Sequence, residues 1–135
     1  MIERYTTKEM KELWSDENKY NTWLKVELAA LKSQSELGIV PKEICNKILK
    51  KAKFDVKRIN EIEETVKHDV IAFTTSVGES IKELSSYFHY GLTSSDVVDT
   101  SWCFLTSEAL KIILKEVDNL LETLKKQAFK YKDTV

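Results

Sequence analysis

From Ser94 to Val135 the sequence contains neither glycine nor proline, so nothing in this stretch interrupts a helix. Apolar residues recur along it at alternating spacings of four and three, and midway the apolar seam shifts by one position. The pattern predicts one helix of about forty residues, about 55–60 Å long at ~1.5 Å rise per residue. Its seam consists of Val98, Trp102, Leu105, Ala109 and Ile112, followed by Ile113, Val117, Leu120 and Leu124.

A helix of that length exceeds any core that the rest of a 135-residue chain can provide. Because more than one of its faces is apolar, we expect it to pack against partners outside these residues rather than to protrude freely. The segment from Gln127 to Val135 carries no glycine or proline stop. Its lysines favour a helix end through the dipole, which suits a natural terminus, but we expect a chain cut inside or just after a helix.

The remainder of the chain also indicates helices, because three glycines and one proline leave little room for hairpin turns. We therefore predict an all-α protein, with residues 85–92 forming a loop before the long helix. We expect five earlier helices. The first is opened by a Thr6–Glu9 capping box and reaches Trp14, and the second is capped by Ser15 or Asp16 and stops at Gly38. The third has Pro41 in its first turn, the fourth is capped by Asp55, and the fifth runs from Asp69 to Leu84.

Composition excludes several classes of protein. The 21 basic and 22 acidic residues nearly cancel, unlike the basic footprint of a nucleic-acid binder. No apolar run approaches the length of a membrane span, and the N-terminus has no secretory signal. Cys45 and Cys103 fit neither a zinc spacing nor a disulfide framework, so we interpret them as reduced, mostly buried thiols. These features predict a soluble, cytoplasmic protein with no nucleic-acid or membrane partner.

Polar residues gather where the long helix begins, in the segment His89–Asp96. The first N–H groups of a helix lack internal partners and carry partial positive charge, so this start can bind a carboxylate or phosphate. Thr93 and Asp96 also have the spacing of a capping box, which leaves a purely structural role open. His89 lies among aromatic residues, where a packed loop histidine is the common alternative to a catalytic one.

Two further clusters can carry chemistry. Arg4 offers a planar fork for phosphate or carboxylate, and Tyr5 beside it can stack on a base, although such a pair is often only surface. Lys67-His68-Asp69 stands between two helix patterns, where His68 can titrate near neutral pH and Asp69 can cap the next helix; an ordinary corner is the alternative. The two histidines have no further ligands at metal-binding spacing, so no metal or other cofactor is predicted.

In this order and spacing, the three clusters resemble the adenylosuccinate lyase family of the fumarase/aspartase superfamily. The matching segments are Arg4-Tyr5, Lys67-His68-Asp69-Val70 and His89–Thr100, of which the last is the most specific. The resemblance covers the whole chain but only the N-terminal portion of the family. It implies an all-α fold with residues 1–92 as a substrate-binding domain and residues 93–135 as the start of a long-helix bundle.

The family eliminates fumarate from adenylosuccinate and from the succinyl-carboxamide ribotide of purine synthesis, and it forms homotetramers with shared active sites. The resemblance implies that Arg4 binds the phosphate and Tyr5 the nucleotide. It further implies that Thr93 and Ser94 hold a succinyl carboxylate. Around the bond to be cleaved it places His68 and Asp69, with Lys67 on the nucleotide and His89 in the same wall; His68 and His89 are the candidate catalytic residues.

The family's base is a serine in a Ser-Ser-x-Met-Pro-x-Lys-x-Asn-Pro loop, and its acid is a histidine of a later Thr-His segment. Neither motif occurs here, since the only proline is Pro41 and both histidines are already placed. We therefore expect these 135 residues alone to be inactive. The alternative function is a non-catalytic helical module that self-associates through its long C-terminal helix.

Overall fold

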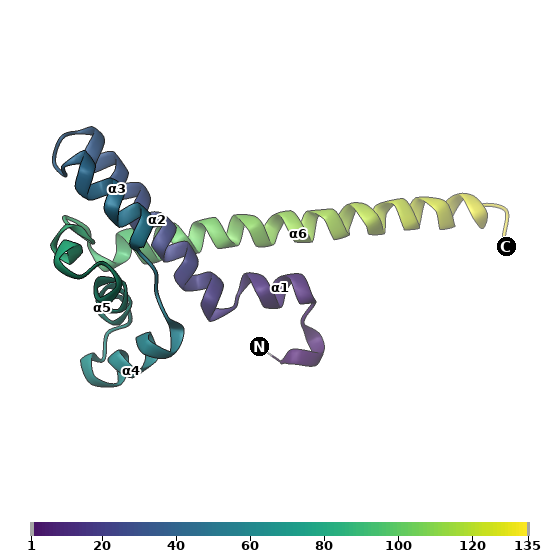
Figure 1. Ribbon diagram of the computed structural model, residues 1–135. Helices are drawn as coiled ribbons and strands as arrows, with labels where there is room; N and C mark the ends of the chain where they lie inside the picture. The colour runs from purple at the N-terminus through teal and green to yellow at the C-terminus, as the bar shows by residue number, and fades with distance from the viewer. Residues whose placement is uncertain (1, 135) are drawn as a thin grey trace.

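The computed structural model describes residues 2–134, all of whose regular elements are helices, so the all-α prediction is confirmed. Figure 1 shows the shorter helices gathered at one end of a single long helix, which extends alone beyond them. The elements, in chain order, are η1 (Glu3–Tyr5), α1 (Lys8–Leu13), α2 (Asp16–Glu36), α3 (Lys42–Lys51), α4 (Val56–Val66), α5 (Asp69–Ile81), η2 (Lys82–Tyr87) and α6 (Ser94–Lys130).

Local capping chemistry explains several of these boundaries. The hydroxyl of Ser15 accepts a hydrogen bond from Asn18 N–H at 3.2 Å, and a carboxylate oxygen of Asp55 accepts one from Arg58 N–H at 2.9 Å. Each side chain thereby satisfies an N–H group that the first helical turn leaves without a partner. Gly38 follows the end of α2 with φ +77°, a conformation that glycine adopts without strain. These three predicted boundaries are correct.

Three predicted boundaries are wrong by a few residues. Thr7, not Thr6, caps α1 by accepting from Met10 N–H at 3.3 Å, because the hydroxyl of Thr6 instead donates to the Ile2 carbonyl at 3.0 Å. Pro41 precedes α3 as its cap residue and does not lie in its first turn.

The fifth helix ends at Ile81 and not at Leu84, since Lys82 has φ 55° and turns the chain into η2. This turn brings Leu84 and Phe88 into the core, each less than one tenth exposed. The predicted loop 85–92 is therefore partly a 3-10 helix.

Aromatic side chains form the centre of the core. Phe73 of α5 is fully buried and touches rings from α2, the α3–α4 linker and the segment after η2. Its ring stacks on Tyr20 at 5.9 Å between centroids and meets Trp23 edge-on at 5.5 Å. Phe54 and Phe88 lie 6.3 Å away on other sides. Offset and edge-on rings at such distances favour one fixed arrangement of α2 against α5.

An ion pair on the surface ties α4 to α5. Arg58 donates from Nη2 to Glu79 Oε1 at 2.7 Å and from Nε to the same carboxylate at 3.1–3.2 Å. A guanidinium fork matches the two oxygens of a carboxylate in this way. The Arg58 hydrogen bonds lower the pKa of the Glu79 carboxyl below its ordinary value.

Among the described residues, the N-terminal half of the long helix anchors it to the rest of the protein. Its buried residues are Val97, Ser101, Leu105 and Ala109, four positions apart each time. The predicted seam of Val98 and Trp102 is therefore displaced by one position, and Trp102 is 62% exposed. Figure 1 shows α2 crossing α6 obliquely, and rows of residues spaced by four form the ridges that pack in oblique crossings.

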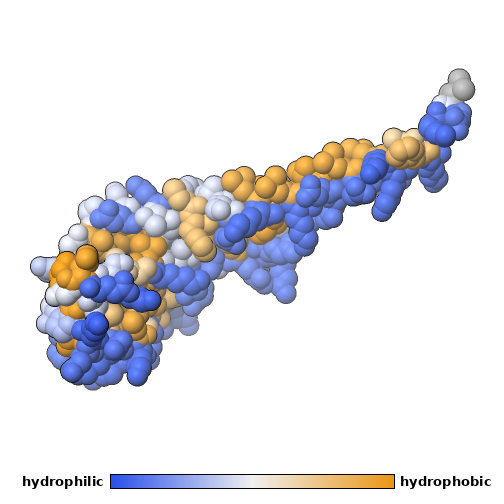
Figure 2. All heavy atoms as spheres, turned by 90° about the horizontal axis from the view of Figure 1, so that it is seen from above, coloured by the Kyte–Doolittle hydropathy of each residue, from blue (hydrophilic) through white to orange (hydrophobic). Residues whose placement is uncertain are grey.

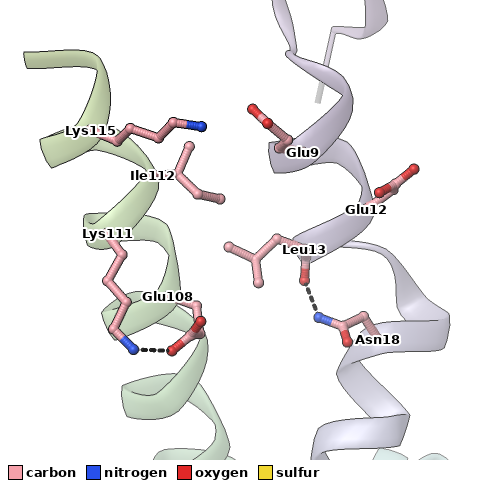
Figure 3. A pocket seen from close by; sticks show the side chains of 8 residues that line it. All are labelled: Glu9, Glu12, Leu13, Asn18, Glu108, Lys111, Ile112 and Lys115. Carbon is pink, nitrogen blue, oxygen red and sulfur yellow. Dashed lines mark hydrogen bonds and ion pairs between the residues drawn. The ribbon is translucent and has the colours of Figure 1, made fainter. Parts of the chain in front are cut away.

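The short helix α1 covers the next part of α6. Figure 3 shows Leu13 and Ile112 facing each other across an open cavity of about 480 Å³ between the two helices. Glu9 lies on the α1 side of the cavity and Lys115 on the α6 side (Figure 3).

Beyond Ile112, every described residue of α6 is exposed. Figure 2 shows a hydrophobic band along this free part of the helix. Cys103 is also exposed on α6 whereas Cys45 is buried, so the prediction of two mostly buried thiols is correct only for Cys45; both are free thiols. None of the helices within residues 2–134 combines the length and apolar character of a membrane span.

Candidate functional site

The long helix starts as its sequence predicts. Thr93 is the cap residue of α6, with φ −108° and ψ 165°, and its backbone N–H donates to a carboxylate oxygen of Asp96 at 2.8 Å. Ser94 and Ser95 are the first helical residues. Thr93 is exposed and Ser94 is half-buried, so the partially positive start of a 37-residue helix faces outward with hydroxyl groups around it. The predicted Thr93–Asp96 capping box is present, so Thr93 and Asp96 have the structural role, and an anionic group would meet only the first-turn N–H groups that this box leaves over.

The segment Lys67–Asp69 forms a tight corner between α4 and α5. Lys67 closes α4 in a left-handed conformation with φ 52°, and its side chain is exposed. His68, and not the predicted Asp69, is the cap of α5: its Nδ1 accepts from Ile71 N–H at 3.4 Å. The reason is that the Asp69 carboxylate turns back to its neighbour and accepts from Val70 N–H at 2.7 Å. Because Nδ1 of neutral His68 is an acceptor, its ring proton resides on Nε2.

Asp69 opens onto a cavity of about 330 Å³ that α2, α5 and α6 form together with Trp14, the residue that follows α1. Three tryptophans make up much of its wall: Trp14, Trp23 and Trp102. Ser101 also lines this cavity. Its side-chain oxygen is buried and has no hydrogen-bond partner among the described residues. A buried hydroxyl without a partner is costly, typically by about 1–3 kcal/mol.

His89 occupies a strained turn just before α6 and pairs with a buried carboxylate. Its φ is 61°, and its Nδ1 lies 2.5 Å from Oε1 of Glu27, whose side chain is 1% exposed. Burial raises the pKa of the Glu27 carboxyl, while the His89 imidazole opposes that shift. His89 also lines a second cavity, of about 690 Å³, with hydroxyl residues of α5 and η2 such as Thr74 and Ser85.

Arg4 and Tyr5 lie apart from these groups. Both are exposed in η1, and the guanidinium carbon of Arg4 lies 4.8 Å from the ring centroid of its neighbour. Figure 1 shows this N-terminal turn well separated from α5. The structure thus brings Asp69 next to the second turn of α6, but it leaves Arg4-Tyr5 distant and gives His89 a different cavity.

Glu27 and Ser101 are the notable residues that sequence reasoning did not single out. Each interrupts an apolar row at helical spacing: Glu27 stands four positions from Trp23 and from Leu31, and Ser101 four from Val97 and Leu105. A polar residue in such a row is the signal that was available, because a buried carboxylate or hydroxyl needs a partner. Within residues 2–134, no three His, Cys, Asp or Glu side chains lie where they could hold a metal ion.

The arrangement of helices matches part of two solved structures. A fumarate lyase from Mesorhizobium sp. BNC1 superposes with a TM-score of 0.86 over 93% of this chain and 30% of that protein, at 22% identity. A β-carboxy-cis,cis-muconate cycloisomerase from Acinetobacter calcoaceticus sp. ADP1 gives 0.75 over 92% and 31%, at 21% identity. These structures establish the class of fold: an all-helical domain of the kind found in a fumarate lyase.

The family follows from the sequence comparisons. The family model described as lyase matches residues 3–135, and the chain belongs to that family. Adenylosuccinate lyases from Helicobacter pylori strain 26695 and Bacillus subtilis strain 168 are 50% and 45% identical to it over all 135 residues. That from Aquifex aeolicus is 46% identical over 138 positions. The predicted resemblance is thereby confirmed, and the chain spans 31–32% of the length of these relatives.

Proposed function

We propose that the chain is part of an enzyme that eliminates fumarate from adenylosuccinate to give AMP, and from succinyl-aminoimidazole carboxamide ribotide to give AICAR. The observation that carries the proposal is the 45–50% identity to adenylosuccinate lyases along the whole of this chain. Reinforcing it, the two central clusters fall at the starts of consecutive helices, at the cap of α5 and at the cap of α6. Residues 1–92 would form the substrate-binding domain, and residues 93–135 would begin the bundle.

The proposed roles follow from the chemistry of each position. The start of α6 is proposed to hold a succinyl carboxylate through the first-turn N–H groups near Thr93 and Ser94 other than that of Asp96, which the Thr93 side chain caps. His68 presents Nε2–H as a donor, since its other nitrogen is held by the α5 backbone. Arg4 is proposed to contact the phosphate. Tyr5 and Lys67 are proposed to contact the nucleotide, and Asp69 to lie near the bond to be cleaved.

The reaction itself is a β-elimination. A base removes the proton from the carbon next to a succinyl carboxylate, and the electron pair forms the double bond of fumarate as the C–N bond breaks. The departing nitrogen takes a proton from an acid, and N–H donors stabilise the charge that builds on the carboxylate. His68 and His89 are the candidate catalytic groups in this chain. The serine-loop motif that supplies the family's base is absent from its sequence.

The separation of Arg4-Tyr5 from the α4–α5 corner supports a site assembled from several copies. In such an assembly the exposed arginine of one copy would complete the site of another. The exposed apolar band on α6 supports the same proposal, since a helix face of this kind needs a partner. We propose a homotetramer for the whole enzyme, acting in the cytoplasm, and self-association through α6 for these residues.

The first test measures catalysis. The 135 residues alone are expected to release no fumarate from adenylosuccinate, because the groups proposed as base and acid for the family are missing. Fumarate is followed by its ultraviolet absorbance against a preparation of an unrelated protein from the same host. Turnover above that blank would show that the missing segments are not needed for the chemistry.

The second test measures binding. Adenylosuccinate at millimolar concentration is expected to shift the amide signals of Thr93, Ser94 and His68, and Thr93→Ala is expected to abolish the shifts at the start of α6. Thr123→Ala is the matched control, since Thr123 lies on the exposed far part of the same helix. Unchanged signals in a sample that still self-associates would favour the alternative, a non-catalytic helical module, for which the exposed α6 band is the supporting observation.

A further inference from the structure

The pair formed by Glu27 and His89 is not accounted for by packing. Glu27 lies in the middle of α2, 2% exposed, on the same face as the core residues Trp23 and Leu31. A carboxylate in such a place is expensive unless it is hydrogen-bonded to a partner. Burial raises the pKa of the Glu27 carboxyl, and the imidazole and the backbone N–H of His89 oppose that shift by favouring the ionised form. The core therefore contains the polar residue Glu27, and its side-chain partner, His89, is a candidate catalytic group.

The same helix holds the backbone around His89. Gln34, seven residues after Glu27, donates from its side-chain nitrogen to the Tyr90 carbonyl at 2.7 Å. His89 and Gly91 both have positive φ, 61° and 71°, and a left-handed conformation is unfavourable for a non-glycine residue such as His89. The two α2 side chains thus hold a strained turn in place, two residues before the cap of α6.

The pairing also determines which ring nitrogen of His89 is free. Its Nδ1 faces the Glu27 carboxylate at 2.5 Å, so Nε2 is the nitrogen left for another group. The side chain is 25% exposed and lines the cavity of about 690 Å³ between α5, η2 and the turn. His68 has the opposite arrangement, because its Nδ1 accepts a backbone N–H and its proton lies on Nε2.

We propose that Glu27 is a positioning residue for His89: it holds the ring proton on Nδ1 and thereby presents Nε2 to the substrate. In the neutral ring, Nε2 then accepts a proton or a hydrogen bond; in the charged ring, it donates to an anion. A carboxylate behind an imidazole fixes ring orientation and tautomer in this way. That His89 meets a succinyl substrate rests on the proposed function, whereas the tautomer does not.

The test reads the protonation of both rings by ¹⁵N NMR of the 135-residue chain near neutral pH. The two histidines are expected to differ, with Nδ1 protonated in His89 and not in neutral His68. Glu27→Gln retains an acceptor oxygen and is expected to keep the His89 proton on Nδ1. Glu27→Leu, of similar volume, removes the acceptor and is expected to move the proton to Nε2 while the His68 signals stay unchanged.

Gln34→Ala is the matched control, because it removes the other tie from α2 to the turn but leaves the carboxylate. It is expected to leave the His89 tautomer as it is. An unprotonated Nδ1 in native His89, or equal changes in Gln34→Ala and Glu27→Leu, would overturn the proposal. The native measurement needs no variant to fold. Failure of adenylosuccinate to bind a chain with the expected tautomers would count against the proposed function and leave the role of Glu27 intact.

Discussion

The exposed apolar face of α6 provides the most direct test of assembly. Leu114 and Leu121 lie seven positions apart on this face and are 61% and 58% exposed. Their neighbours on the same side of the helix are also apolar, including Leu110, Val117 and Leu124, each between 43% and 54% exposed. The perturbation is the double substitution Leu114→Gln and Leu121→Gln. Glutamine is a good helix former, so the change removes the apolar surface without weakening the helix.

The size of the effect follows from the exposed fractions. Full burial of a leucine side chain contributes about 1.5–3 kcal/mol, so covering the exposed part of each of these two contributes about 1 kcal/mol. A symmetric dimer buries both leucines from both copies, which amounts to about 4 kcal/mol. Since each 1.4 kcal/mol is tenfold in affinity, the double variant is expected to raise the Kd of self-association roughly 1000-fold.

Sedimentation equilibrium across a concentration series measures that Kd. The matched control is Lys115→Gln with Glu122→Gln, which are also seven positions apart and exposed, and which lie about 100° around α6 from the two leucines. This control leaves the net charge unchanged and is expected to leave the Kd within about threefold of the native value, the range of ordinary surface changes. A native chain that stays monomeric at high concentration, or a control that weakens association as much as the leucine variant, would refute the reasoning.

Two further predictions concern stability. Phe73→Ala removes the ring at the centre of the aromatic core and is expected to lower the free energy of unfolding by about 3–5 kcal/mol in urea titrations, whereas Phe129→Ala, 70% exposed, should change it by less than about 0.5 kcal/mol. Arg58→Gln removes the partner that lowers the pKa of Glu79. Its free energy of unfolding should therefore be below that of the native chain at pH values above the ordinary carboxyl pKa, and the difference should shrink as the pH falls through the lowered pKa of Glu79. The exposed Lys57→Gln serves as its control, and a deficit that grows in acid would contradict the assignment.

The parts of the fold that sequence predicted well are those decided within a few residues. Ser15, Asp55 and Thr93 cap their helices as expected, because a cap depends on one short side chain and the N–H groups of the next turn. The two wrongly predicted caps occur where two neighbouring side chains can each cap the helix. The hydroxyl of Thr6 bonds to a carbonyl and leaves the cap to Thr7, and Asp69 bonds to its neighbour and leaves the cap to His68.

What sequence could not supply is contact between distant segments. Which row of α6 is buried depends on the angle at which α2 crosses it, so the seam begins at Val97 and not at Val98. His89, the partner of Glu27, lies 62 residues away in a turn with positive φ, and no local sequence pattern predicts this pairing. The candidate site was recognisable as three clusters, but their arrangement, with Arg4-Tyr5 apart from the rest, needed the fold.

The same helix connects the candidate site to assembly. The first turns of α6 carry the Thr93 start and are fixed in the core through Val97 and Leu105, while every described residue beyond Ile112 is exposed. A partner that packs on the free part therefore positions the whole helix start as a rigid unit, because a continuous helix transmits its orientation along its length. If Arg4 of one copy contributes to the site of another copy, the register in which the α6 helices pack determines whether Arg4 lies close enough to that site. Substitutions on the distal apolar face would then alter substrate binding at a distance, through assembly and not through the site itself.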